Sequence, residues 1–305
     1  MTGAICSPLF ARSDDASRVP HLPGYAAVPV RYGLINRMLL VAMVNGHKAT
    51  FMVDTGAARS LLDAGFARTF GVKPLGEDSP YGARTDVNGT SAQIGFINHL
   101  TAGEMDFGGG PIVINGEYGK ERASSFYHRD EIAGVLGADI LTRYKAVINC
   151  RQRVIFFKLN DSGRLQLARF CASQHFARVP LREEVTRSFT VPASLRGHPI
   201  RLIVDTGAPL TLLDQDLVKS LGIPLKPTRV VGAFINSTAS AVSLGQFSDL
   251  QIGDFRLARQ KLTVSELPEF VVELGKVNSA GVLGIDSLVS NRAIIDFEGM
   301  NLFLK

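Results

Sequence analysis

Apolar residues along this chain occur in short runs that turn-forming pairs interrupt, and this pattern predicts β-hairpins rather than long helices. Residues 38–53 contain two apolar stretches on either side of Asn45-Gly46, a pair suited to a type I′ turn. Residues 187–204 repeat the arrangement around Arg196-Gly197. In both places the second stretch ends at an aspartate, which is therefore expected at the carboxyl end of a strand.

A short helix is expected after each hairpin. Asp63 and Asp214 have the side chain of a helix N-cap, and Gly71 and Gly222 follow at the distance of a helix end. Gly, Ser, Thr and Asn then dominate two segments, which we expect to form hairpins covering a cleft. These segments are 76–100 and 226–247. The pattern as a whole predicts a mainly β chain with a few short helices.

The aspartates that end the two hairpins belong to one repeated sequence. Asn45–Asp63 aligns without a gap with Arg196–Asp214, at an offset of 151 residues and with 10 of 19 positions identical. Both stretches contain Asp-Thr-Gly-Ala, at Asp54–Ala57 and Asp205–Ala208. A repeat of this length exceeds the ~20–50 residues of solenoid units, which indicates two homologous lobes.

A second pair of signatures follows in the same order. Gly134–Asp139 matches Gly281–Asp286 at an offset of 147 residues, and each is followed by an apolar, strand-like ending. The Val-Leu-Gly within each signature is expected to pack beneath the loop that carries the aspartate, with the glycine allowing close backbone approach. The predicted organisation is a poorly ordered leader at 1–24, a first lobe at 25–158, a linker at 159–177 and a second lobe at 178–305.

Composition narrows the class of protein further. The chain has 305 residues, of which 46% are hydrophobic and 20% charged, as in globular proteins. The net charge of +5 is spread along the chain, so no nucleic-acid partner is expected. No apolar run approaches ~18 residues, which argues against a membrane partner. Residues 1–24 lack the apolar stretch of a signal peptide, so the cytoplasm is the expected compartment.

The cysteines and histidines add no further chemistry. Cys6, Cys150 and Cys171 imply no disulfide framework, although two of them could pair across the lobe junction. His47 and His198 occupy the same place in the repeat, beside a hairpin turn, and no ligand cluster accompanies them. We therefore expect no metal and no cofactor.

The doubled aspartate is the main candidate for chemistry. If the two lobes bring Asp54 and Asp205 face to face, the two carboxyl groups cannot both ionise, so one holds a proton while the other can accept one. A single Asp-Thr-Gly would be most simply a turn, whereas two copies in matching contexts favour a catalytic pair. Asp139 and Asp286 also recur, but their positions before helical stretches indicate helix caps.

The doubled Asp-Thr-Gly, each with a downstream Val-Leu-Gly, resembles the aspartic peptidases, and the alanine after each Asp-Thr-Gly is similar to the retropepsin version. The resemblance covers about 260 residues in two units. It implies two acid-protease β-barrel lobes related by a pseudo-two-fold axis. In such a monomer Asp54 and Asp205 would activate water to hydrolyse a polypeptide bound between the lobes.

The resemblance also implies roles for the residues beside the acids. The hydroxyl groups of Thr55 and Thr206 would hold the two loops together, and Gly56 and Gly207 would bring backbone N–H groups to the carboxylates. Ala57 and Ala208 lack the hydroxyl that pepsin-like enzymes have there. Losing that donor predicts a less acidic pair and activity at mildly acidic or neutral pH.

Two other functions remain open from the sequence. The chain could be a catalytically silent peptide-binding module of the same fold. It could also be a protease limited to self-processing, with residues 1–24 as the segment removed.

Overall fold

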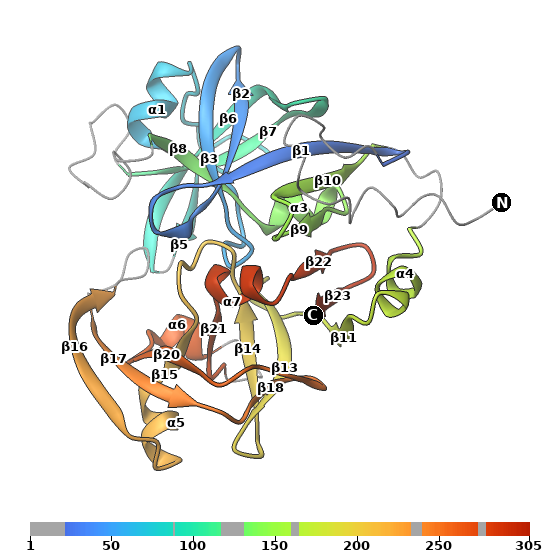
Figure 1. Ribbon diagram of the computed structural model, residues 1–305. Helices are drawn as coiled ribbons and strands as arrows, with labels where there is room; N and C mark the ends of the chain where they lie inside the picture. The colour runs from blue at the N-terminus through green and yellow to red at the C-terminus, as the bar shows by residue number, and fades with distance from the viewer. Residues whose placement is uncertain (1–21, 88, 117–130, 160–164, 233–239, 274–278) are drawn as a thin grey trace.

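The computed structural model describes residues 22–87, 89–116, 131–159, 165–232, 240–273 and 279–305. In these residues the chain forms two β-rich lobes, one above the other in Figure 1, with a few short helices. The mainly β prediction is confirmed. The repeated order of elements also shows that both halves of the chain are built on one plan.

The first lobe is a single curved sheet whose strands run in the order β1-β2-β3-β8-β4-β7-β6-β5. The long strand β6 also pairs with β2 through Thr101 and Leu100, which brings the sheet back onto itself. The strands are β1 (Tyr25–Tyr32), β2 (Met38–Val44), β3 (His47–Val53), β4 (Leu61–Asp63), β5 (Arg84–Val87), β6 (Thr90–Ala102), β7 (Met105–Asn115) and β8 (Ile132–Leu136).

The second lobe has a sheet in the order β16-β17-β20-β15-β21-β14-β13-β18-β19, with β12 paired to β13. Its centre copies the first lobe: β14 pairs in parallel with β21 as β3 does with β8, and β15 lies between β20 and β21 as β4 lies between β7 and β8. The strands are β12 (Arg182–Glu183), β13 (Phe189–Leu195), β14 (His198–Val204), β15 (Leu212–Asp214), β16 (Leu225–Gly232), β17 (Ser240–Phe247), β18 (Leu250–Ile252), β19 (Phe255–Arg256), β20 (Gln260–Ser265) and β21 (Gly281–Leu283).

The apolar endings of the two repeats form one sheet that joins the lobes. Each ending folds into a pair of short strands, and the antiparallel pairing of β9 with β22 aligns Ile148 with Ile295 across the junction. The order through this sheet is β11-β23-β22-β9-β10-β1. The additional strands are β9 (Val147–Asn149), β10 (Val154–Lys158), β11 (Ala177–Pro180), β22 (Ile294–Asp296) and β23 (Asn301–Leu304).

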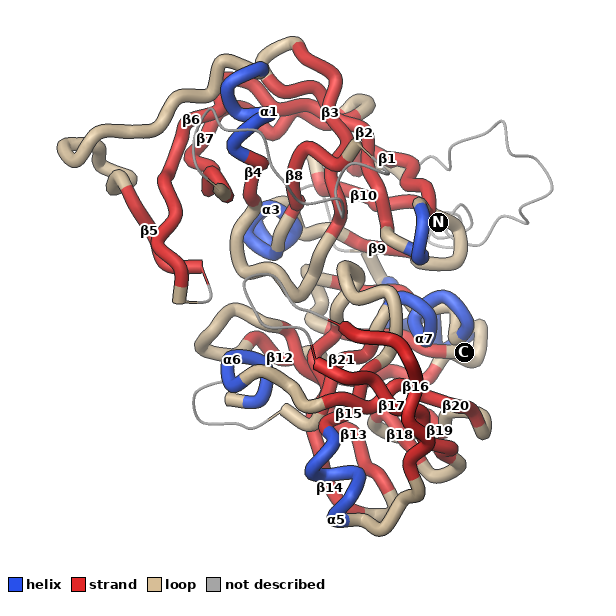
Figure 2. Tube along the Cα trace, turned by 90° about the vertical axis from the view of Figure 1, so that its left-hand side faces the viewer, coloured by secondary structure: helices blue, strands red, loops and turns tan. Residues whose placement is uncertain are grey.

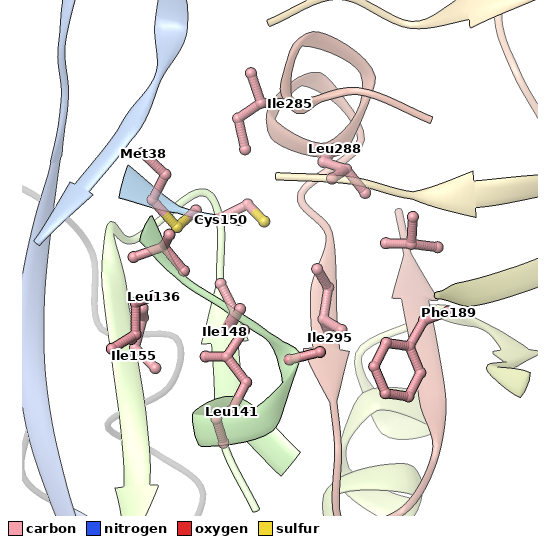
Figure 3. Close-up of a cluster of buried hydrophobic side chains, with 14 of the residues drawn as sticks. Met38, Leu136, Leu141, Ile148, Cys150, Ile155, Phe189, Ile285, Leu288 and Ile295 are labelled. Carbon is pink, nitrogen blue, oxygen red and sulfur yellow. The ribbon is translucent and has the colours of Figure 1, made fainter. Parts of the chain in front are cut away.

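One hydrophobic core continues from the first lobe into the second. Leu136 and Ile148 of the first half belong to the same buried cluster as Ile285 and Ile295 of the second half, and all four are almost completely buried. Figure 3 shows these side chains around the junction. Because burial of apolar surface is the main stabilising term in folding, the shared core holds the two lobes in a fixed relation.

The predicted turns are confirmed by their backbone angles. Asn45 and Gly46 have φ values of 49° and 84°, and Arg196 and Gly197 have φ values of 52° and 80°. Two central residues with positive φ define the type I′ turn, which matches the twist of paired strands.

The predicted N-caps are confirmed as well. Asp63 accepts a hydrogen bond from Gly65 N at 2.9 Å, and Asp214 accepts one from Leu217 N at 2.9 Å. The helices are α1 (Ala64–Thr69), α3 (Ala138–Arg143), α4 (Leu167–Ser173), α5 (Gln215–Ser220), α6 (Glu269–Val272) and α7 (Ile285–Ser290), with a 3₁₀ turn at Leu34–Asn36.

Parts of the predicted leader and linker pack against the folded body. Residues 1–21 lie outside the described part, but Leu22 is fully buried in a cluster with Phe156 and Phe303 and so belongs to the folded body. The predicted linker contains α4, whose Leu167 and Cys171 are buried in the same cluster. Both observations share a physical reason: sparse apolar residues in a polar segment can still pack into a core that forms elsewhere. Both Cys150 and Cys171 are thiols and form no disulfide.

Candidate active site

Each Asp-Thr-Gly loop begins where a central strand ends. Asp54 follows β3 and its N–H donates to Leu136 O at 3.1 Å, while Asp205 follows β14 and donates to Leu283 O at 3.1 Å. The acceptors belong to the Val-Leu-Gly strands, β8 and β21, so these lie beneath the loops as predicted. The parallel pairing of β3 with β8, and of β14 with β21, therefore fixes the position of the aspartate that follows each strand.

Glycine is required after the Val-Leu of both signatures. A Cβ atom on Gly137 would lie 2.7 Å from Arg59 C, and one on Gly284 would lie 2.4 Å from Leu210 C. Since no side chain fits there, the chain can pass directly under the Asp-Thr-Gly loop, as the sequence predicted.

The two aspartates face each other across the lobe interface. A Cβ atom placed on Gly207 would lie 2.4 Å from Cγ of Asp54, and one placed on Gly56 would lie 2.7 Å from Cγ of Asp205. Each carboxyl group therefore rests against the glycine backbone of the opposite loop. Any larger residue would displace the carboxyl group, so both glycines are needed to bring the acids together.

Two threonines lock the loops to each other. The hydroxyl of Thr55 donates to Val204 O at 2.6 Å and accepts from Thr206 N at 3.1 Å. The hydroxyl of Thr206 donates to Val53 O at 2.8 Å and accepts from Thr55 N at 3.1 Å. Both threonines are completely buried. Four hydrogen bonds with no access to water make a rigid cross-connection between the lobes.

Backbone donors orient each carboxyl group. Asp54 Oδ1 accepts from Gly56 N at 2.8 Å and from Ala57 N at 3.1 Å. Asp205 Oδ1 accepts from Gly207 N at 2.7 Å and from Ala208 N at 3.0 Å. One oxygen of each acid is thereby fixed.

The environment changes the acidity of the pair. Burial raises the pKa of Asp54 well above its usual range, and the charge of Asp205 and a hydrogen bond with it raise that pKa further. Burial also raises the pKa of Asp205, although its hydrogen bond with Asp54 and its backbone donors oppose the shift. The pair thus retains a proton where an ordinary aspartate has lost it, and this proton belongs to the two groups together.

A supporting network lies behind each loop, and it corrects the role predicted for Asp139. The N-cap of α3 is Gly137, and Asp139 is the second residue of the helix. Its Oδ1 accepts from Ser60 N at 2.9 Å and from Ser60 Oγ at 2.7 Å, and Ser60 Oγ in turn accepts from Gly137 N at 2.9 Å. The carboxylate therefore ties the helix to the loop that follows Asp54.

The second lobe repeats this network. Gly284 is the N-cap of α7, and Asp286 Oδ1 accepts from Thr211 N at 2.7 Å and from Thr211 Oγ1 at 2.8 Å. Ser60 and Thr211 were missed by the sequence reasoning. Their signal was available, since both are hydroxyl residues at the same position of the repeat.

The remaining candidates lie away from the acids. His47 begins β3 and stacks on Phe70 at 5.6 Å between ring centroids, and His198 begins β14; both are exposed, as predicted for turn-edge residues. In the described residues no group of three or more metal-ligating side chains occurs. No helix in the described part is long and apolar enough to cross a membrane.

Both predicted cover segments contain hairpins. They are β5–β6 and β16–β17, and Figure 1 shows both on the same side of the molecule. Figure 2, which looks onto that side, shows β5 on the upper lobe and β16 on the lower lobe. Asn88 and residues 233–239 lie outside the described part.

The paired acids, the glycine contacts and the threonine cross-connection form one site between the two homologous lobes. Comparison with known proteins agrees. Residues 40–143 match the family model described as "gag-polyprotein putative aspartyl protease", and residues 191–287 match the model described as "Aspartyl protease". One aspartate of the pair lies in each matched region. No curated protein matches the sequence.

Among solved structures, basic 7S globulin from soybean shares the fold. The similarity has a TM-score of 0.52 at 11% sequence identity and covers 92% of this chain and 94% of that one. At this identity the likeness concerns the two-lobed, pepsin-like architecture alone. The two family matches, one in each lobe, and the shared two-lobed architecture together support a two-lobed aspartic peptidase.

Proposed function

We propose that this protein is an endopeptidase that uses Asp54 and Asp205 to hydrolyse peptide bonds. The observation that carries the proposal is the contact of each carboxyl group with the opposite glycine, which puts the two acids around one shared space. Asp54 is 8% exposed and Asp205 is half-buried, so the pair is shielded yet open to a substrate.

The proposed reaction depends on Asp54 and Asp205 sharing one proton, so that one acid can accept a proton while the other donates one. The ionised carboxyl takes a proton from a water molecule between the acids, and the water oxygen bonds to the scissile carbonyl carbon. The protonated carboxyl gives its proton to the carbonyl oxygen, which forms a neutral gem-diol. The carboxyl that gained the water proton then protonates the amide nitrogen, while the other carboxyl takes a proton from one gem-diol hydroxyl. The C–N bond breaks to give an amine and a carboxylic acid, and the pair again holds one proton. These steps need no cofactor.

The substrate class follows from the shape of the lobes. We infer that a polypeptide binds as an extended strand between the lobes, with main-chain hydrogen bonds supplying affinity and side-chain pockets supplying selectivity. The protein would act as a monomer, because one chain supplies both acids.

The test is cleavage of denatured casein and of a peptide library by the wild type, by Asp54→Asn and by Asp205→Asn. We expect cleavage by the wild type and a loss of at least about a hundredfold in both variants, because neither can complete the proton exchange. Asp249→Asn is the matched control, since Asp249 forms an exposed ion pair with Arg256 at 3.0 Å. Full activity in either site variant would refute the assignment, and a wild type that binds peptides without cleaving them would instead be a binding module.

The pH–rate profile is a second test. Because burial raises the pKa values of both acids, and the charge of Asp205 raises the pKa of Asp54 further, we expect maximal activity at mildly acidic to neutral pH. A maximum below about pH 3 would contradict this reasoning.

A further inference from the structure

A cavity of about 340 Å³ lies in the first lobe at the base of the β5–β6 hairpin. Most of its lining residues are polar, among them Arg84, Ser91 and Gln93 of the hairpin and Asn115 at the end of β7, although more of the lining surface is apolar than polar. Ligand pockets of small-molecule size begin at ~300 Å³, so the cavity can hold an amino-acid side chain.

Asn115 is the unusual member of this lining. The residue is only 6% exposed, and its amide nitrogen Nδ2 is buried without a hydrogen-bond partner in the described part of the chain. A buried donor left without an acceptor costs ~1–3 kcal/mol, and folded proteins rarely retain one without a reason. An acceptor supplied by a ligand would remove that cost.

Strand register places Asn115 on the face of the sheet that carries the catalytic loop. Leu61 pairs with Val113, and both belong to a buried cluster that includes Ala57, the residue after Asp-Thr-Gly. Asn115 lies two residues beyond Val113 and so shares its face. Ala92, which lines the cavity, belongs to the same cluster. The cavity is thus linked to the Asp54 loop through one continuous set of contacts.

The second lobe provides an internal comparison. Asn115 pairs with Asp63, and the equivalent pair in the second lobe is Ser265 with Asp214. Ser265 is 3% exposed, but its hydroxyl donates to Ala241 O at 3.0 Å, so its donor is used within the protein. The fold therefore does not require the residue at this position to have a donor without a partner, as Asn115 has among the described residues.

The residue pair beside Asn115 in the sheet also offers more hydrogen-bond donors than its equivalent in the second lobe. In the first lobe Arg84 pairs with Gln93, whereas the second lobe has Pro227 paired with Ser243. Arg84 donates to Ser91 through Nε at 2.7 Å and Nη2 at 3.1 Å, which holds its guanidinium group at the cavity. Only the first lobe, among the residues described, combines a cation and a buried amide donor here.

We propose that this cavity is a specificity pocket that accepts a glutamate or glutamine side chain of the substrate, and prefers glutamate. The proposal rests on the proposed peptidase function. Asn115 Nδ2 would donate to the side-chain oxygen, and the Arg84 guanidinium would favour the carboxylate over the amide. Because the second lobe lacks these donors, the pocket would make two otherwise similar lobes unequal and fix the direction in which the peptide binds.

The test is cleavage-site profiling of a degenerate peptide library by mass spectrometry. We expect the wild type to enrich Glu, and next Gln, at one position on one side of the cleaved bond. Asn115→Leu removes the donor at similar volume, and it should reduce kcat/KM for a Glu peptide relative to its Leu analogue by about tenfold or more. Arg84→Gln should reduce the preference for Glu over Gln. Ser265→Ala is the matched control and should leave the profile unchanged.

A binding measurement separates failure of the pocket from failure of the peptidase function. The Asp54→Asn chain, with and without Asn115→Leu, is titrated with three peptides that differ only in Glu, Gln or Leu at the tested position. Weaker binding of the Glu peptide to the double variant supports the pocket even if the wild type cleaves nothing. Equal binding of all three peptides, or a Glu preference that survives Asn115→Leu, would overturn it.

Folding provides an independent control. Since Asn115→Leu removes a buried amide nitrogen that has no partner among the described residues, the variant should unfold at the same temperature as the wild type or a higher one. A lower unfolding temperature would mean that Asn115 already has an internal role, and the pocket assignment would then fail.

Discussion

Replacing Thr206 by valine tests how strongly the threonine cross-connection stabilises the protein. The change keeps the shape of the side chain but removes the hydroxyl, which donates to Val53 O at 2.8 Å and accepts from Thr55 N at 3.1 Å. Both partner groups stay buried, because Thr55 and Val53 have no exposed surface. Each buried group left without a partner costs ~1–3 kcal/mol, so Thr206→Val should lower the free energy of unfolding by about 2–6 kcal/mol.

That loss is large beside the ~5–15 kcal/mol by which domains are usually stable. Urea denaturation followed by circular dichroism would measure the change. Thr206→Ser keeps the hydroxyl and should lose only ~1 kcal/mol with its methyl group. Thr69→Val is the matched surface control, since Thr69 is exposed, and it should change stability by less than about 0.5 kcal/mol. A Thr206→Val variant as stable as the Thr69→Val variant would refute the reasoning.

Three further changes give distinct readouts. Asp54→Asn should stabilise the protein at neutral pH. Burial raises the pKa of Asp54 in the folded state, so the wild type loses stability as the pH rises through that pKa. Asparagine cannot ionise, so the variant does not have this loss. Gly207→Ala should lower kcat/KM by about a hundredfold, because its Cβ would fall 2.4 Å from Cγ of Asp54 and displace the acid. Lys158→Met should cost ~1.5–3 kcal/mol of unfolding free energy, because the largely buried Glu298 then keeps, among the described residues, only the Tyr25 hydroxyl and the more distant Lys145 as partners.

Each of these changes has its own control. Stability of the Asp54→Asn variant relative to wild type should increase from about pH 4 upward, and a constant difference would contradict the linkage argument. Gly76→Ala, where an added Cβ meets nothing within 4 Å, should leave kcat/KM unchanged. Arg256→Met breaks an exposed ion pair and should cost less than about 1 kcal/mol; an equal cost for Lys158→Met would show that its ion pair contributes little.

The sequence by itself determined the features that depend on local pattern. The Asn45-Gly46 and Arg196-Gly197 turns, and the caps at Asp63 and Asp214, were predictable because the residues that make them lie within a few positions of each other. The duplication extended this to the site: two copies of Asp-Thr-Gly in matching contexts predicted that two carboxyl groups would meet. Symmetry supplied long-range information that a single sequence usually lacks.

Tertiary structure alone decided which distant groups became partners. The role of Asp139 depends on Ser60, 79 positions away, and the joined lobes depend on pairing between β9 and β22. Within the described residues, it also decided that the hydroxyl of Ser265 has an acceptor while the amide nitrogen of Asn115 has none. The physical reason is that such pairings are selected by the packing of the whole core, whose energy is summed over many remote contacts and leaves no local pattern.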